Sequence, residues 1–229
     1  MNMRRKIISI LVVFTILLSY GIQMPVSIRA ASDSISYSLK VYDSDGQNYM
    51  EYPVIYAKKS VTKHIGDKNF YIDNGVDGDG DVYYESSNEK VVTVDSSGSV
   101  KIRGCGTAMI TIIVAETDRY YPGEKDVKVT VLPNSIKKFK VKSMENGIKC
   151  TWKKMNFNNV KCIIQASENR KFKKPVTAKP YSELKKGYWK GVGLKKNKVY
   201  YIRIRQIAKF SNKQFKYGKW SKIVKVKIK

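Results

Sequence analysis

The sequence has one histidine, His64, and few acidic residues in its second half. Zinc sites and Cys–His catalytic pairs need several such ligands at fixed spacings, and none surrounds His64. A glycosidase needs two carboxylates on one site. Residues 134–229 hold only Glu145, Glu168 and Glu183, which are far apart in the sequence. The sequence therefore indicates a protein that is not an enzyme, and it predicts no catalytic residue and no cofactor.

Cysteine is also scarce, and its odd count of three excludes a dense disulfide framework. Cys150 and Cys162 both fall on predicted inward faces of strands. There they either form one buried bridge or pack as buried thiols, and buried thiols are the favoured interpretation. Cys105, between two glycines, has no evident partner. Stability must therefore come from packed sheets.

Long apolar runs are absent after the first thirty residues. Basic residues at 4–6 precede an unbroken apolar run over 7–18, and small residues offer a cleavage site after Ala30. This layout predicts a signal peptide over residues 1–30. The alternative is an uncleaved anchor, since the run extended to Ile22 approaches the length of a membrane span. We expect the mature chain to have no transmembrane span and to be secreted, extracellular and associated with the cell wall.

Acidic charge is distributed unequally along the mature chain. Residues 31–133 contain 11 Lys and Arg against 16 Asp and Glu, a balance of −5. Residues 134–229 contain 29 against 3, a balance of +26, and four basic residues in the leader complete the total of +25. The change falls at the turn-type stretch 132–135. We therefore predict two domains, 31–133 and 134–229, with opposite charge.

Helical periodicity is missing from both predicted domains, and short β-type runs separated by turn residues take its place. Residues 127–131 alternate with period two, as in a half-buried strand. Residues 95–98 have the chemistry of a tight hairpin in which Gly98 takes a positive φ. The pattern predicts an all-β fold of two tandem immunoglobulin-like β-sandwiches behind the signal peptide.

Turn residues and apolar positions agree with a known family over the run SSNEKVVTVDSSGSVKIRGCGTAMITI at 86–112. This run resembles the bacterial Ig-like group 2 family, which repeats a Ser-Ser-Asn, Val-x-Thr-Val, Asp-x-x-Gly and Gly-x-Gly/Ala-Thr-Ala series. The resemblance covers about residues 53–133. Residues 31–52 lie outside it and are expected to supply an edge strand or a lead-in.

The second predicted domain resembles a fibronectin type III domain over residues 134–229. The resemblance depends on Trp152, expected at the centre of the core on the second strand, and on Leu194 six residues before Tyr200. It implies that Tyr200 occupies the tyrosine corner, where the phenolic hydroxyl bonds to nearby backbone. The large number of lysines is not general to that family.

Three alternating carboxylates, Asp77, Asp79 and Asp81, are a weak candidate for a calcium site. An EF-hand loop needs glycine at its sixth position and glutamate at its twelfth, where this sequence has Val82 and Asn88. A solvated turn is the favoured interpretation, and weak divalent-ion binding is the alternative.

The lysines of residues 134–229 are the feature of the sequence that most strongly indicates a function. A charge of +26 over 96 residues costs self-repulsion and exceeds what solubility requires. Binding an anionic polymer would relieve the repulsion and release counterions. The predicted polyanion-binding residues are Lys171, Lys173, Lys174, Lys185, Lys186, Lys195, Lys196, Lys198, Arg203, Arg205, Lys225, Lys227 and Lys229.

The expected partner is an anionic polymer or glycan of the cell envelope or matrix, bound by a monomeric adhesion module. Nucleic acid is expected as a partner only if it is extracellular. A protein partner is a further alternative. The competing interpretation is a structural spacer with no specific ligand. Trp189, Tyr201 and Trp220, predicted to be exposed, could add stacking to a binding surface. A cation–π brace of Trp220 with Arg203 and Arg205 is the favoured reading of those three residues.

Overall fold

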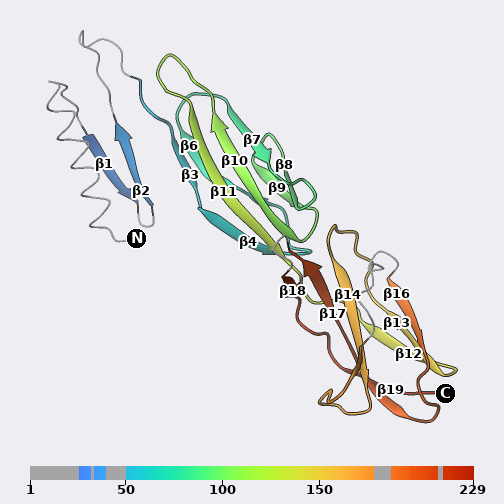
Figure 1. Ribbon diagram of the computed structural model, residues 1–229. Helices are drawn as coiled ribbons and strands as arrows, with labels where there is room; N and C mark the ends of the chain where they lie inside the picture. The colour runs from blue at the N-terminus through green and yellow to red at the C-terminus, as the bar shows by residue number, and fades with distance from the viewer. Residues whose placement is uncertain (1–25, 32–33, 40–49, 178–186, 211–213) are drawn as a thin grey trace, which may run out of the picture. The chain divides into compact units, whose positions relative to one another are not determined.

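The fold consists of strands joined by turns and loops (Figure 1). The computed structural model describes residues 26–31, 34–39, 50–177, 187–210 and 214–229. No helix occurs in these residues, which confirms the all-β prediction. Accordingly, this part of the chain contains no helix that is long and apolar enough to cross a membrane.

The chain forms two compact units that interleave in sequence. Unit 1 comprises Met1–Ala57, Asp73–Tyr84 and Ile112–Lys125. Unit 2 comprises Lys58–Ile72, Glu85–Thr111 and Asp126–Lys229. The predicted domain boundary at residue 133 falls inside unit 2 and stays a prediction.

The first described strands are β1 (Val26–Ala31) and β2 (Ser34–Leu39), which pair antiparallel with Val26 opposite Leu39. The predicted cleavage site after Ala30 falls within β1. Residues 1–25 of the predicted signal peptide lie outside the described residues, so processing stays a prediction.

Export with cleavage predicts a mature chain that begins at Ala31, because signal peptidases cut after a small residue. We expect the protein recovered from the medium of an expressing cell to give Ala31 as its first residue on N-terminal sequencing. A variant with Ala30→Asp, which places a charge at the cleavage position, should accumulate uncut. A membrane-bound protein that keeps its first thirty residues would instead establish the anchor alternative.

Nine strands follow between residues 54 and 132, and most of their side chains alternate between core and solvent. They form three sheets, ordered β4-β11-β10-β7, β3-β6 and β5-β9-β8, and β4 and β11 are parallel. Their bounds are β3 (Val54–Ala57), β4 (Ser60–His64), β5 (Phe70–Tyr71), β6 (Asp73–Asp77), β7 (Val82–Ser86), β8 (Val92–Val94), β9 (Ser99–Ile102), β10 (Gly106–Val114) and β11 (Gly123–Leu132).

Two local predictions in this segment are confirmed. Val127, Val129 and Val131 of β11 are fully buried, as the alternation predicts. Residues 95–98 form a turn in which Gly98 has φ 76° and the Asp95 carboxylate accepts hydrogen bonds from Ser97 and Ser99. The bond from the Ser97 hydroxyl is the main reason that the pKa of Asp95 lies below its usual value.

The strands after residue 139 pair as in a fibronectin type III sandwich. One sheet is β12-β13-β16, and the other is β15-β14-β17-β18 with β19 also paired to β17 (Figure 1). Inward side chains such as Ile148, Ile164, Ile202 and Ile204 are at most 2% exposed and fill the core. The bounds are β12 (Lys140–Met144), β13 (Gly147–Thr151), β14 (Lys161–Ser167), β15 (Val176–Thr177), β16 (Tyr188–Val192), β17 (Val199–Lys209), β18 (Phe215–Tyr217) and β19 (Val224–Lys227).

The tyrosine corner is confirmed. The Tyr200 side chain is buried, and its hydroxyl accepts a hydrogen bond from the Lys195 backbone N–H at 3.3 Å. The same hydroxyl donates to Glu168 Oε1 at 3.3 Å. Trp152 is also buried, although it lies directly after β13 rather than within the strand, and Leu194 is only half-buried.

The prediction that Trp189 is exposed is wrong. Trp189 pairs with Cys150 across β16 and β13, and paired residues point to the same face of a sheet. Since Cys150 is fully buried, Trp189 also points inward and is half-buried. Its ring lies over Gly191, where an added Cβ would come within 2.1 Å of the indole.

Cys105, Cys150 and Cys162 are all buried thiols in the structure. Burial raises the pKa of Cys105 and of Cys150 to about 12, and nearby Cys162 adds to the shift at Cys150. The favoured interpretation of Cys150 and Cys162 as packed thiols agrees with this arrangement.

A raised pKa keeps a thiol protonated and unreactive, so native protein at pH 8 should not react with Ellman's reagent. Unfolding in guanidinium should expose three thiols per chain. One thiol in the unfolded protein would show one disulfide, which peptide mapping would assign to Cys150 and Cys162 or to another pair, and rapid reaction of the native protein would contradict the burial of the thiols.

Candidate functional site

Strand pairing brings the ends of three separate segments together at one end of the second sandwich. Ser167 at the end of β14 pairs with Tyr201 near the start of β17, and Val199 pairs with Lys227 at the end of β19. The loops 168–175 and 193–198 and the segment after β19 therefore adjoin. Eight basic residues in these segments and two in β19 itself form a group of ten that we call the basic pole: Arg170, Lys171, Lys173, Lys174, Lys195, Lys196, Lys198, Lys225, Lys227 and Lys229.

All ten residues of the basic pole are exposed. Among the described residues next to these segments, the acidic ones are Glu145 and Glu168, so the pole together with these two carboxylates has a net charge of +8. Among the described residues, none of the ten is in an ion pair, and the Glu168 carboxylate instead accepts from Tyr200. Like charges repel one another, so a bound polyanion would stabilise the pole.

The first lysine loop is anchored by an aromatic residue. Phe172 is 7% exposed, with φ 54°, and its N–H donates to the Asn169 carbonyl at 2.8 Å. Asn169 also accepts from the Lys171 N–H through its side chain. Because the Phe172 ring is buried against the Arg203 guanidinium, its neighbours Lys171 and Lys173 are held toward solvent.

The second lysine loop is tied to the C-terminal segment. The Asn197 N–H donates to the Ile228 carbonyl at 3.0 Å, and the Ile228 N–H donates to the Lys198 carbonyl at 2.9 Å. Ile228 itself is buried. These bonds fix Lys195, Lys196 and Lys198 beside the end of β19, so the loop's charge is positioned before any ligand binds.

Two arginines of β17 are interleaved with aromatic rings, and we call this stack the arginine ladder: Phe172, Arg203, Trp220, Arg205 and Tyr217. The Arg203 guanidinium carbon lies 3.9 Å from the centroid of Phe172 and 4.1 Å from that of Trp220. The Arg205 carbon lies 4.3 Å from Trp220 and 4.0 Å from Tyr217. The predicted brace of Trp220 with both arginines is confirmed.

The ladder leaves its arginines less available to a ligand than the lysines are. Arg203 donates from Nε and Nη2 to Gln165 Oε1 at 2.9 and 2.6 Å. Partial burial lowers the pKa of both guanidinium groups, and at Arg203 the neighbouring Arg205 lowers it further. Arg205 Nε is buried without a hydrogen-bond partner. We therefore assign Arg203 and Arg205 primarily to the ladder.

The other predicted polyanion-binding residues are the exposed lysines of the basic pole, except Lys185 and Lys186, which lie outside the described residues. Arg170 was missed by the sequence reasoning. The run Asn-Arg-Lys at 169–171 could have revealed it. Since β14 ends at Ser167, Arg170 lies in the same loop as Lys171, Lys173 and Lys174. Tyr201 and Trp220 were also predicted to be exposed, and this prediction is wrong because both are half-buried. Tyr201 lies on the outer face of β17, opposite Lys225.

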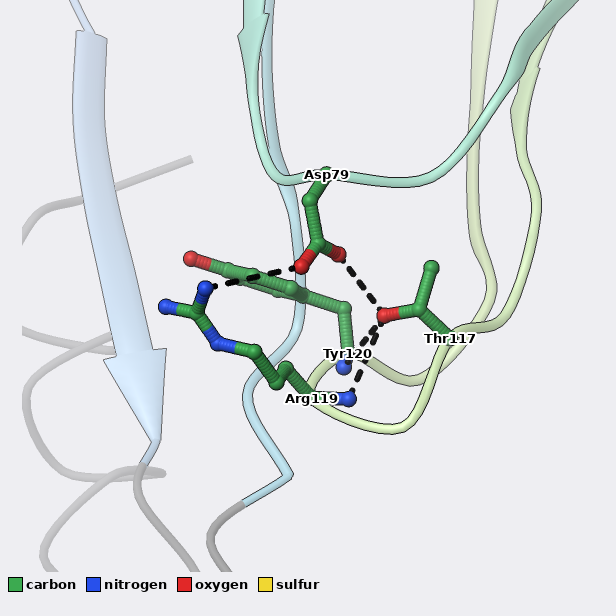
Figure 2. A network of polar contacts seen from close by, with 4 residues as sticks. All are labelled: Asp79, Thr117, Arg119 and Tyr120. Atoms are coloured by element: carbon green, nitrogen blue, oxygen red, sulfur yellow. Dashed lines mark hydrogen bonds and ion pairs between the residues drawn. The ribbon is translucent and has the colours of Figure 1, made fainter.

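The acidic candidates Asp77, Asp79 and Asp81 belong to unit 1. Figure 2 shows the Asp79 carboxylate accepting a hydrogen bond from the Thr117 hydroxyl at 2.7 Å and facing Arg119 Nη1 at 3.7 Å. The Asp81 carbonyl accepts from the Ala115 N–H. No group of three potential metal ligands gathers within the described ranges. These contacts fix the loop 115–121.

A family model described as "Intimin, immunoglobulin-like domain" matches residues 74–116, which is less than half of the chain. No curated protein matches the chain significantly. Among solved structures, the chain is similar to the FN1–FN3 domains of chicken CNTN1, with 10% sequence identity and a TM-score of 0.32 over 85% of this chain and 78% of that chain. The family match and the strand pairing support immunoglobulin-like and fibronectin type III-like β-sandwich features, while the bacterial Ig-like group 2 assignment stays a prediction.

Proposed function

We propose that this chain is an exported, non-catalytic adhesion module whose basic pole binds anionic polymers of the cell envelope or matrix. The observation that carries the proposal is the convergence of three segments that place ten exposed cations beside two carboxylates within the part of the chain that the structure describes. An immunoglobulin-like match to an intimin domain supports a surface role. Phosphate- or sulfate-bearing polymers fit best, because lysines act as point charges toward such groups.

Retention measured against salt tests this proposal. The mature chain would be applied to immobilised poly(glycerol phosphate), to heparin and to a neutral dextran matrix at 50–500 mM NaCl. We expect binding to at least one anionic matrix, with log K falling linearly as log salt rises, and no binding to dextran. Absence of binding to both anionic matrices at low salt would favour the spacer interpretation.

A further inference from the structure

We infer that unit 1 carries a second site, the tyrosine edge formed by Tyr52, Tyr120 and Tyr121, and that this site binds neutral glycans. The inference does not rest on the basic pole. It starts from an unusual surface: among residues 50–57, 73–84 and 112–125, the large apolar side chains that are exposed are Tyr52 at 50% and Tyr83 at 54%. Both are tyrosines, and Tyr52 belongs to the tyrosine edge, whereas Tyr83 lies on β7 outside it. The other two rings of the edge, Tyr120 and Tyr121, are half-buried beside Tyr52.

Two of the three rings of the tyrosine edge are stacked on each other. Tyr52 and Tyr121 have centroids 4.9 Å apart and planes inclined by 26°. The Arg119 guanidinium carbon lies 5.9 Å from the centroid of Tyr120, and Arg119 also faces Asp79 (Figure 2). An exposed ring with donors and acceptors beside it can stack on the C–H face of a pyranose and hydrogen-bond its hydroxyls.

The two segments that supply the tyrosine edge are held together by backbone bonds. The Glu51 N–H donates to the Arg119 carbonyl, and the Tyr121 N–H donates to the Glu51 carbonyl, both at 2.8 Å. Pro53, next to Tyr52, packs against Gly78 and Gly123. A Cβ at either glycine would come within 2.9 or 2.5 Å of the proline ring. This close packing fixes where Tyr52 leaves the backbone.

The loop that carries Tyr120 is fixed from the other side. The Thr117 hydroxyl donates to Asp79 and accepts from the N–H groups of Arg119 and Tyr120 at 3.2 and 3.0 Å (Figure 2). The Thr117 N–H in turn donates to the Tyr120 carbonyl at 3.0 Å. The aromatic surface is therefore organised in advance, which reduces the entropy lost when a ligand binds.

Charge decides which class of ligand fits. The described residues of unit 1 from residue 50 onward hold eight carboxylates against Arg119 and Lys125, a net charge of −6. An anionic polymer would be repelled here. A protein partner would find little aliphatic surface to bury, since neither exposed side chain is Leu, Ile, Val, Met or Phe. A neutral sugar uses the same carboxylates as hydrogen-bond acceptors without needing opposite charge.

The test is a binding screen of the full mature chain on soluble neutral hexamers of glucose, N-acetylglucosamine, mannose and galactose, followed by titration calorimetry. We expect saturable binding of at least one hexamer that changes less than about twofold between 0.05 and 0.5 M NaCl, because no counterion is released. Tyr52→Ala with Tyr121→Ala should weaken it by about tenfold or more. Tyr52→Phe, which keeps the stacked ring, should retain most of the affinity.

The matched control is Tyr71→Ala, which removes a 70% exposed tyrosine from β5 in unit 2 and should leave glycan binding unchanged. Circular dichroism checks that each variant is folded. Binding of none of the four hexamers, or equal binding by the Tyr52 and Tyr121 variant, would overturn the inference. Preferential binding of poly-lysine that disappears in salt would assign the edge to a cationic polypeptide instead. Binding of a neutral glycan should not depend on salt, whereas binding of a polyanion to the basic pole should. The two proposals can therefore fail independently of each other.

Discussion

Replacing Lys195, Lys196 and Lys198 by glutamine is expected to weaken binding to an anionic polymer by about 100-fold at 0.1 M salt, because each lost phosphate contact removes about one released counterion. The slope of log K against log salt should become shallower by about two. These lysines are exposed in a loop whose backbone is bonded to Ile228, so their removal should leave the fold intact. Titration of the polymer at several salt concentrations gives both quantities.

A charge-matched control separates local binding from overall charge. Lys209, Lys216 and Lys219 are also exposed in unit 2, but they lie around β18 at the opposite end of β17 from the basic pole. Their replacement by glutamine removes the same three charges. We expect its effect on affinity to be less than about tenfold, because charges distant from the contact act only through the screened field.

Trp220→Ala is expected to lower the free energy of unfolding by about 3 kcal/mol, because the indole is the central ring between two guanidinium groups. Its loss would leave a gap between Arg203 and Arg205, whose like charges then face one another with less shielding. Urea unfolding followed by circular dichroism measures the change. Trp220→Phe, which retains a smaller ring, should lose only about 1 kcal/mol.

We expect the arginine ladder to affect the stability of the protein and the basic pole to affect its binding, so the two effects can be measured independently. Trp220→Phe should keep the salt slope of the parent chain, because the charged lysines remain in place. Conversely, the Lys195, Lys196 and Lys198 variant should keep the parent stability within about 0.5 kcal/mol or gain slightly from reduced repulsion. A Trp220→Ala protein with unchanged stability would show that the stacking contributes little.

Local sequence signals predicted the parts of the fold that depend on neighbouring residues. The alternation at 127–131 and the Asp95 turn both depend on chemistry within about five positions. The Tyr200 corner involves Lys195, which is also close in sequence. Such features could be predicted because strand periodicity and turn geometry are local properties of the backbone.

Features that depend on strand register could not be predicted in the same way. Trp189 points inward because it pairs with Cys150, about forty positions away, and Gly191 leaves room for its ring. The partner of Asp79 is Thr117 on a distant loop. The basic pole likewise requires the pairing of β14, β17 and β19, so a list of lysines did not show which ones lie together.

We propose that the basic pole, rather than the total charge, binds an anionic polymer. The most direct test is the slope of log K against log salt for poly(glycerol phosphate), measured for the parent chain and the two charge-matched triple variants. We expect a slope shallower by about two for the Lys195, Lys196 and Lys198 variant and by less than one for the Lys209, Lys216 and Lys219 variant. Equal slopes for the two variants would contradict it.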